Sequence, residues 1–115
     1  DLQANIIPEE RDAMKSRYSI EIDFRIAMEH ADKVEKIGND MNQMCEEELE
    51  ACIQSIRNHW TGENAELFLE KEEQMRNGVV SLAERVIQTA ETIREMAQNL
   101  YQAEMQAWEI ANERE

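Results

Sequence analysis

The sequence predicts an all-α fold, in which two long helices form an antiparallel hairpin and hairpins assemble into a four-helix bundle. The chain has 115 residues with only three Gly and one Pro, which leaves little material for the turns of an all-β fold. Apolar residues recur at helical spacing over two long stretches, which favours amphipathic helices. One break separates these stretches at residues 58–64, where Thr61-Gly62 offers a way to reverse the chain direction.

The charge of the chain restricts the partners that it can bind. It contains 26 Asp and Glu against 12 Lys and Arg, a formal net charge of -14. This balance argues against nucleic acid or an anionic membrane as the main partner. No stretch approaches the roughly 18 apolar residues of a membrane span, and no basic and apolar leader opens the sequence. We therefore expect no membrane span and no signal peptide, in a protein that is cytoplasmic or leaves the cell without a cleaved signal.

Residues 1–18 are predicted to form an N-terminal extension, and residues 19–115 the hairpin domain. Within the extension, Pro8-Glu9-Glu10 suits the start of a helix, because Pro is favoured at the first helical position and acids complement the helix dipole. A short helix from about Pro8 to Arg17 is therefore expected.

The first long helix is predicted from about Phe24 to His59, which corresponds to roughly 50 Å of helix. Residues 18–24 alternate apolar and polar side chains, so they form either an extended lead-in or the first helical turn. Asp23 is the expected N-cap. Small residues recur seven apart along this helix and let another helix approach closely; they are Ala31, Gly38, Cys45 and Cys52. For Gly38, a mere weak point in a surface helix is the alternative.

The two cysteines are predicted to be buried core residues. On one helix, seven residues place the Cα atoms of Cys45 and Cys52 about 10 Å apart, which is beyond the reach of a disulfide. A bridge between two chains across a dimer remains an alternative.

The second long helix is predicted from about Gly62 to Ala111. Its apolar side chains fall on three neighbouring rows, each with a seven-residue repeat. Three rows make a stripe wide enough to contact two neighbouring helices, and a second hairpin would cover what the first helix does not. The residues expected in the core or dimer interface are Ala31, Gly38, Cys45, Cys52, Phe68, Met75, Val79, Leu82, Val86, Ile93 and Met96.

The turn is expected at residues 60–63. Thr61 can cap the second helix, and Gly62 can take backbone angles denied to other residues. Trp60 can pack its ring against Phe68 or Leu69 and so fix the angle between the two helices.

The sequence offers no constellation of catalytic or metal-binding residues. His30 and His59 stand alone, and no Glu-x-x-His pair exists to build a metal centre in a bundle. The acidic run Glu46–Glu48 lacks the alternating ligands and the turn glycine of a calcium loop, so it is predicted to be a solvated face. We therefore expect a protein that is not an enzyme and has no cofactor.

The placement of Trp60-Thr61-Gly62 at the turn of a helical hairpin resembles the WXG family of early-secretory-antigen-like proteins. Ile56 before the motif and Asn64-Ala65 after it also stand where family members usually have them. The resemblance covers about residues 19–111 and includes the chain length and the acidic composition. It implies dimers of helical hairpins that are exported through the type VII secretion system of Gram-positive and mycobacterial bacteria, with Trp60 and Gly62 as part of the export determinant.

The family also implies an export signal near the end of the second helix. Its common form, Tyr-x-x-x-Asp/Glu, is not met after Tyr101, because the fourth residue onward is Met105. A looser family pattern does fit: an apolar residue, an acid four residues later, and apolar residues three and seven beyond the acid. The candidate signal residues are Leu100, Tyr101, Glu104, Ala107 and Ala111.

Two hypotheses from different classes follow. In the first, the protein is secreted by the type VII machinery, as a homodimer or as a heterodimer with a similar hairpin or with the N-terminal helical domain of a toxin. In the second, it is an intracellular coiled-coil adaptor with a chance Trp-x-Gly. About 40 residues of helix, roughly 60 Å, separate Trp60 from Tyr101, so these two parts of the determinant would meet only across an antiparallel dimer.

Overall fold

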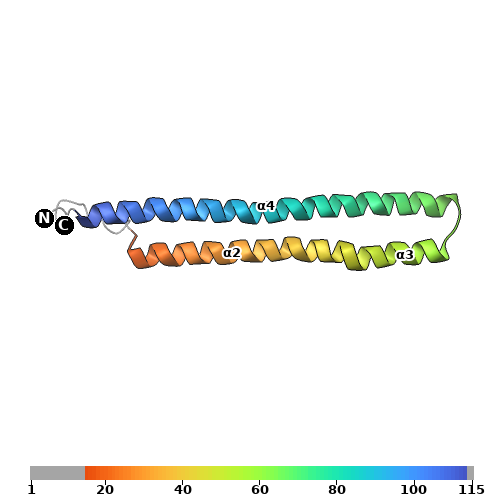
Figure 1. Cartoon of the computed structure of the whole chain (residues 1–115), viewed down its shortest axis with the longest axis horizontal. Helices are drawn as coiled ribbons and strands as arrows, with labels where there is room; N and C mark the ends of the chain where they lie inside the picture. Colours follow the sequence, from red (N-terminus) through yellow and green to blue (C-terminus); the bar gives the residue numbers. More distant parts are fainter. Residues whose placement is uncertain (1–14, 114–115) are drawn as a thin grey trace. The chain divides into compact units, whose positions relative to one another are not determined.

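The computed structural model describes residues 15–113, which are helical except at the N-terminal edge and at one turn. The elements in chain order are α2 (Arg17–Gln43), the π-helix η2 (Met44–Leu49), α3 (Glu50–His59) and α4 (Glu63–Glu113) (Figure 1). No strand occurs within the described range, which confirms the predicted all-α class. None of the helices over residues 15–113 combines the length and apolar character that crossing a membrane requires.

The chain divides into two compact units. Unit 2 is Asp32–Ala90, and unit 1 combines residues 15–31 with residues 91–113 of the described range. The predicted short helix near Pro8 lies almost wholly outside the described residues.

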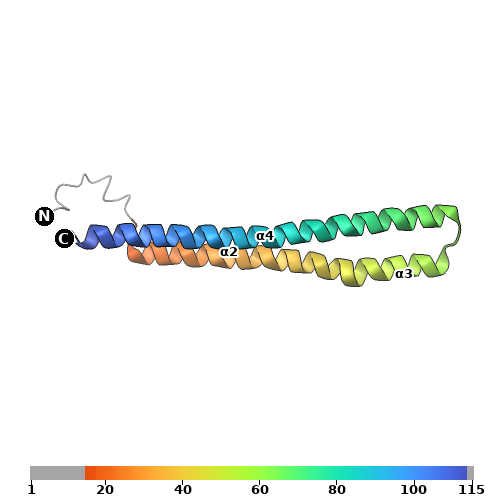
Figure 2. The same ribbon diagram turned by 45° about the horizontal axis from the view of Figure 1, so that its top comes forward.

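Unit 2 is a helical hairpin, as the sequence predicts. The end of α2, followed by η2 and α3, lies beside the first half of α4 (Figure 2). Gly38 is buried at this contact, and a Cβ added to it would lie 2.6 Å from Cγ1 of Ile87 and 3.1 Å from the carbonyl oxygen of Ala83. The close helix approach that the sequence predicted at Gly38 is therefore confirmed.

The π-helix η2 changes which residues of the first arm face α4. A π-helix has i→i+5 hydrogen bonds, so it takes up more residues per turn than an α-helix and shifts the phase of the helix after it. Cys45 is fully buried, as predicted, but Cys52 is exposed and its neighbour Ile53 is buried instead. The predicted burial of Cys52 is wrong because a seven-residue repeat does not persist through the π-turn.

The turn consists of Trp60, Thr61 and Gly62. Gly62 has a φ of 106°, a left-handed conformation that favours glycine, as the sequence indicated. The amide of Glu66 donates to the carbonyl of Gly62 over 3.1 Å, so Gly62 stands at the cap position of α4. The expectation that Thr61 caps this helix is wrong by one residue.

In unit 1, the start of α2 lies beside the end of α4 (Figures 1 and 2). The hydroxyl of Ser16 accepts a 3.1 Å hydrogen bond from the amide of Ser19, which makes Ser16 the N-cap of α2. Asp23 lies inside the helix, so its predicted role as N-cap is wrong, and the alternating residues 18–24 are helical. Ile20 and Ala31 are the buried residues of α2 in this unit.

Gly38→Ala is expected to lower the free energy of unfolding by about 1–2 kcal/mol, because overpacking at the helix contact outweighs the better helix propensity of Ala. Gly78→Ala is the matched control. No atom lies within 4 Å of its added Cβ, so we expect a gain of roughly 0.5–1 kcal/mol. Urea denaturation followed by circular dichroism measures both. A stability gain at Gly38 equal to that at Gly78 would contradict the close approach.

Candidate functional site

In unit 2, α4 places one row of residues against the first arm and leaves another row exposed. The inward row includes Ala83 and Ala90, which are fully buried. The exposed row consists of Phe68, Met75 and Leu82, which are 43%, 50% and 50% exposed. The sequence predicted both rows but not which of them the hairpin itself would cover.

The first arm leaves a matching row exposed. Ile37 and Met44 are exposed, and each directly precedes a buried residue, Gly38 and Cys45. On α4, Leu82 likewise precedes the buried Ala83. The two helices are antiparallel. On both of them, therefore, the residue one position before a buried contact residue points to the same side of the hairpin. Unit 2 therefore has one apolar side, to which both helices contribute; we call it the apolar side, formed by Ile37, Met44, Phe68, Met75 and Leu82.

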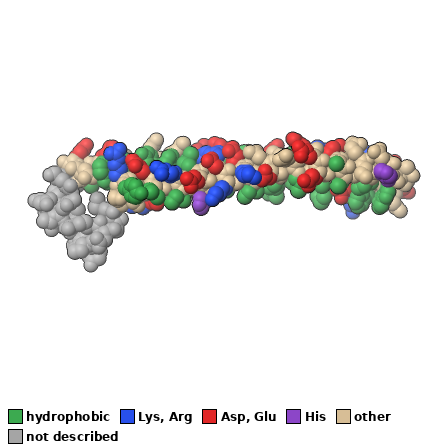
Figure 3. Space-filling view, turned by 90° about the horizontal axis from the view of Figure 1, so that it is seen from below, with side chains coloured by type: hydrophobic (Ala, Val, Ile, Leu, Met, Phe, Trp, Pro, Cys, Tyr) green, Lys and Arg blue, Asp and Glu red, His purple; other side chains and the backbone are tan. Residues whose placement is uncertain are grey.

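The edges of the apolar side differ in charge. On α4 the neighbouring outer row contains no acid; its members are Asn64, Lys71, Gly78 and Arg85. Beside Met44, by contrast, a shallow surface pocket is lined by acids, including Asp40, Glu47 and Glu48. In the space-filling view, hydrophobic side chains gather along the lower edge, next to a face on which acidic and basic groups are mixed (Figure 3). An apolar row with charged borders is suited to binding another amphipathic helix.

The other residues predicted for the interface range from fully buried to exposed. Val79, Val86 and Ile93 are half-buried, Ala31 is fully buried, and Met96 is exposed. The predicted set therefore contains both residues that hold the two helices together and residues that the chain leaves open.

Trp60 lies at the turn with its ring tilted against that of Phe68, at 5.9 Å between centroids. Of the two partners that the sequence offered for Trp60, Phe68 and Leu69, the ring contact is with Phe68. The Trp60 side chain is nevertheless 57% exposed, so it supports the turn with one face and presents the other to solvent. Nearby, Arg57 Nη2 lies 2.7 Å from Glu73 Oε1 and links α3 to α4.

The candidate signal residues of unit 1 fall into two groups. Leu100 is 58% exposed, and Ala107 is also exposed. Tyr101, Glu104 and Ala111 are half-buried. The structure therefore places part of the predicted signal in solvent and part of it against other residues of the chain.

Tyr101 and Glu104 both contact the beginning of the first arm. The Tyr101 ring lies 4.7 Å from that of Phe24, centroid to centroid. Both residues line a small cleft together with Ile20 and Asp23. The aromatic contact accounts for much of the partial burial of Tyr101.

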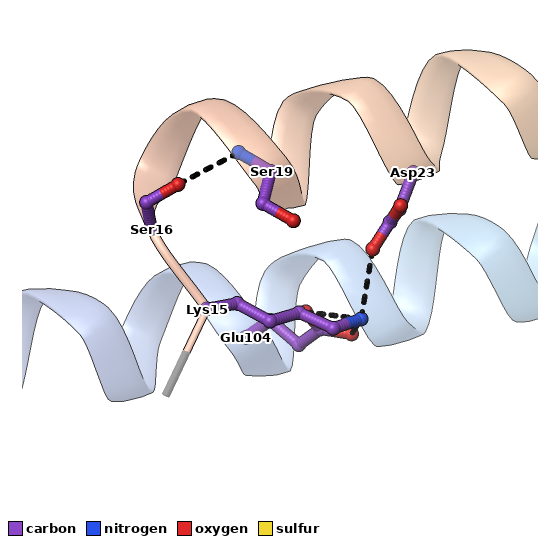
Figure 4. A network of polar contacts seen from close by, with 5 residues as sticks. All are labelled: Lys15, Ser16, Ser19, Asp23 and Glu104. Carbon is purple, nitrogen blue, oxygen red and sulfur yellow. Dashed lines mark hydrogen bonds and ion pairs between the residues drawn. The ribbon is translucent and has the colours of Figure 1, made fainter. Parts of the chain in front are cut away.

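Glu104 is held by Lys15, which precedes α2 (Figure 4). Lys15 Nζ donates to Glu104 Oε1 over 3.1 Å and lies 3.1 Å from Oε2 and 2.9 Å from Asp23 Oδ2. Glu104 Oε2 is buried without a hydrogen-bond partner, so the adjacent ammonium charge is what compensates its burial. The pKa of Lys15 is raised above its ordinary value. The hydrogen bond to Asp23 is the largest cause, and the hydrogen bond to Glu104 is the next.

Sequence reasoning missed Lys15 because it stands within the segment interpreted as an extension. It contacts Glu104 across 89 positions of the chain, and no spacing rule reveals such a pair. A second contact of this kind is that of Arg17, whose guanidinium carbon lies 5.8 Å from the centre of the Trp108 ring.

Residues 15–113 contain no group of three or more His, Cys, Asp or Glu side chains placed to hold a metal ion. No protein-family model, curated protein or solved structure matches this chain. A function for the chain is therefore inferred from its own residues.

Trp60→Ala is expected to lower the free energy of unfolding by about 1–2 kcal/mol, because it removes the aromatic contact and only part of a buried surface. Loss of a fully buried Trp costs roughly 3–5 kcal/mol. Trp60→Phe, which keeps an aromatic ring, is the control and should lose less than Trp60→Ala. A loss in the higher range from urea denaturation would contradict the exposed position of the ring.

From neutral pH upward, the ion pair of Lys15 should lose its contribution only in the alkaline range, where the ammonium group is deprotonated. A lysine whose pKa is raised on folding stabilises the folded state fully below its ordinary value of 10.5, and this contribution is lost as pH rises through the raised value. The stability difference between the wild type and Lys15→Met should thus be constant from neutral pH to near 10 and then shrink. A difference that already disappears between neutral pH and pH 9 would contradict the ion pair.

Proposed function

We propose that this protein is a non-enzymatic helical hairpin of a type VII secretion system, which pairs with a second hairpin and is exported or escorts a toxin partner. The observation that carries the proposal is the turn. Trp60 and Gly62 occupy the break between two long helices, with Gly62 in a left-handed conformation and Trp60 more than half exposed. This is where the WXG family, which the sequence resembles, has the same two residues.

The apolar side of unit 2 supports a role in pairing. It contains large side chains that the hairpin leaves open, including Met75 and Leu82. Contiguous exposed apolar residues in a protein with so many charges are typical of an interaction surface. A second hairpin placed on this side would complete a four-helix bundle, with apolar rows from all four helices in its core.

The partner in this proposal is a second copy, a similar hairpin, or the N-terminal helical domain of a toxin. The outer edge of α4 carries Lys71 and Arg85 without any acid, so it can lie beside an acidic helix. The chain itself offers such a helix, since Asp40, Glu47 and Glu48 gather beside Met44. Electrostatic complementarity of this kind favours specific pairing.

The tail of α4 supplies the second half of the proposed export determinant. Its residues are Leu100, Tyr101, Glu104, Ala107 and Ala111, which match the loose family pattern. An intracellular coiled-coil adaptor, the alternative class, would use the apolar side in the same way but would have no use for this tail or for an exposed tryptophan at the turn.

Pairing is tested by the double variant Met75→Glu/Leu82→Glu, which places charges in the apolar side. We expect the purified wild type to sediment as a dimer, alone or with its partner, and the variant to stay monomeric, because burying two unpaired carboxylates is strongly unfavourable. Gln74→Glu/Ser81→Glu adds the same charge on neighbouring exposed positions and should pair as the wild type does. Equal association of both double variants would refute this interface.

Export is tested by expressing the full chain in a Gram-positive bacterium that has a type VII system. We expect the protein in the culture medium, and we expect Tyr101→Ala/Glu104→Ala to remain in the cells at unchanged abundance. A strain lacking the secretion ATPase is the control for lysis. Retention of the wild type in the cells would favour the adaptor instead.

A further inference from the structure

We propose that the start of α2 is an intramolecular clamp on the tail of α4, which keeps the export signal closed until the clamp is released. The inference rests on the proposed function, because it takes Tyr101 and Glu104 to be residues that the secretion machinery reads. Its basis is that both residues already have partners within the chain, Phe24 and Lys15.

Through Lys15, the clamp covers Glu104. Its side chain is only 20% exposed, although an exposed carboxylate would be needed for a receptor to form an ion pair with it. Lys15 Nζ lies 3.1 Å from both carboxylate oxygens, and Asp23 anchors the same ammonium group from α2 (Figure 4). A receptor that binds Glu104 through a basic group must therefore displace Lys15.

Two more contacts act in the same direction. Phe24 of α2 covers one part of the Tyr101 ring, and the guanidinium of Arg17 lies over the ring of Trp108. Each contact joins the beginning of α2 to the C-terminal part of α4. Tyr101 and Trp108, like Glu104, thus already have partners at the beginning of the chain's first arm.

The ion pair of Lys15 with Glu104 can break without unfolding either helix. Lys15 precedes the cap residue Ser16, so its backbone lies outside the hydrogen-bonded part of α2. Its side chain is 44% exposed, and ion pairs with such exposure are weak and are screened by salt. A receptor with higher affinity for the open tail would shift the population toward the open form.

The test uses the full chain with Lys15→Gln, which removes the charge but keeps a side chain of similar length. Lys36→Gln is the matched control, because Lys36 Nζ pairs with Asp40 within α2 only. The first measurement is the NMR signal of a ¹⁹F-labelled Tyr101. We expect Lys15→Gln to shift it toward that of an exposed tyrosine, and Lys36→Gln to leave it unchanged.

The second measurement is export from a Gram-positive bacterium with a type VII system. Lys15→Gln should raise the exported fraction several-fold at equal cellular abundance, because it shifts the chain toward the open form. Tyr101→Ala/Glu104→Ala should abolish export with or without Lys15→Gln.

The outcomes distinguish refutation of the clamp from refutation of the export signal. If Tyr101→Ala/Glu104→Ala abolishes export while Lys15→Gln changes neither export nor the Tyr101 signal, the clamp is refuted and the proposed function stands. Reduced export of Lys15→Gln would also refute the clamp, since Lys15 would then be part of what the machinery reads. If Tyr101→Ala/Glu104→Ala is exported normally, the tail is not the signal and the proposed function falls together with the clamp.

Discussion

The structure depends on helix contacts made by small side chains. Gly38 admits Ile87 and the backbone at Ala83 so closely that even a methyl group would collide. Ala83 and Ala90 on α4, and Cys45 on the opposite arm, are likewise small and fully buried. Helices that approach through residues of this size have little room between them for large side chains. Apart from Ile20 and Ile53, which are buried, many of the larger apolar groups consequently lie outside the contact.

Because small residues make the contact between the two arms, large apolar side chains remain exposed on the apolar side. Within unit 2 the small residues hold the two arms together, and the residues one position earlier form the apolar side. Pairing with another hairpin therefore need not disturb the contacts that fold the chain. In the pairing that we propose, the acids beside Met44 and the bases beside Met75 would favour one orientation of the two hairpins.

The sequence predicted the class of fold, the two arms and the position of the turn, because helical periodicity and the rarity of turn residues are local properties. It also predicted the small-residue contact at Gly38 and the ring contact of Trp60 with Phe68. It could not show that η2 would expose Cys52, because a π-turn interrupts the repeat on which the prediction was based. It could not find Lys15 either, because the pairing of Lys15 with Glu104 follows from the alignment of the arms and not from any motif.

The π-turn at Met44–Leu49 has a consequence for how the first arm can vary. It separates that arm into two segments, α2 and α3, joined without a loop but packed in different phases. Each segment can therefore pack against its own part of α4 without changing the packing of the other segment. The two opposing arms can do so although they differ in their number of residues. The arm therefore consists of a long and a short helical segment with one continuous backbone, and the π-turn accommodates the extra residue inside the helix.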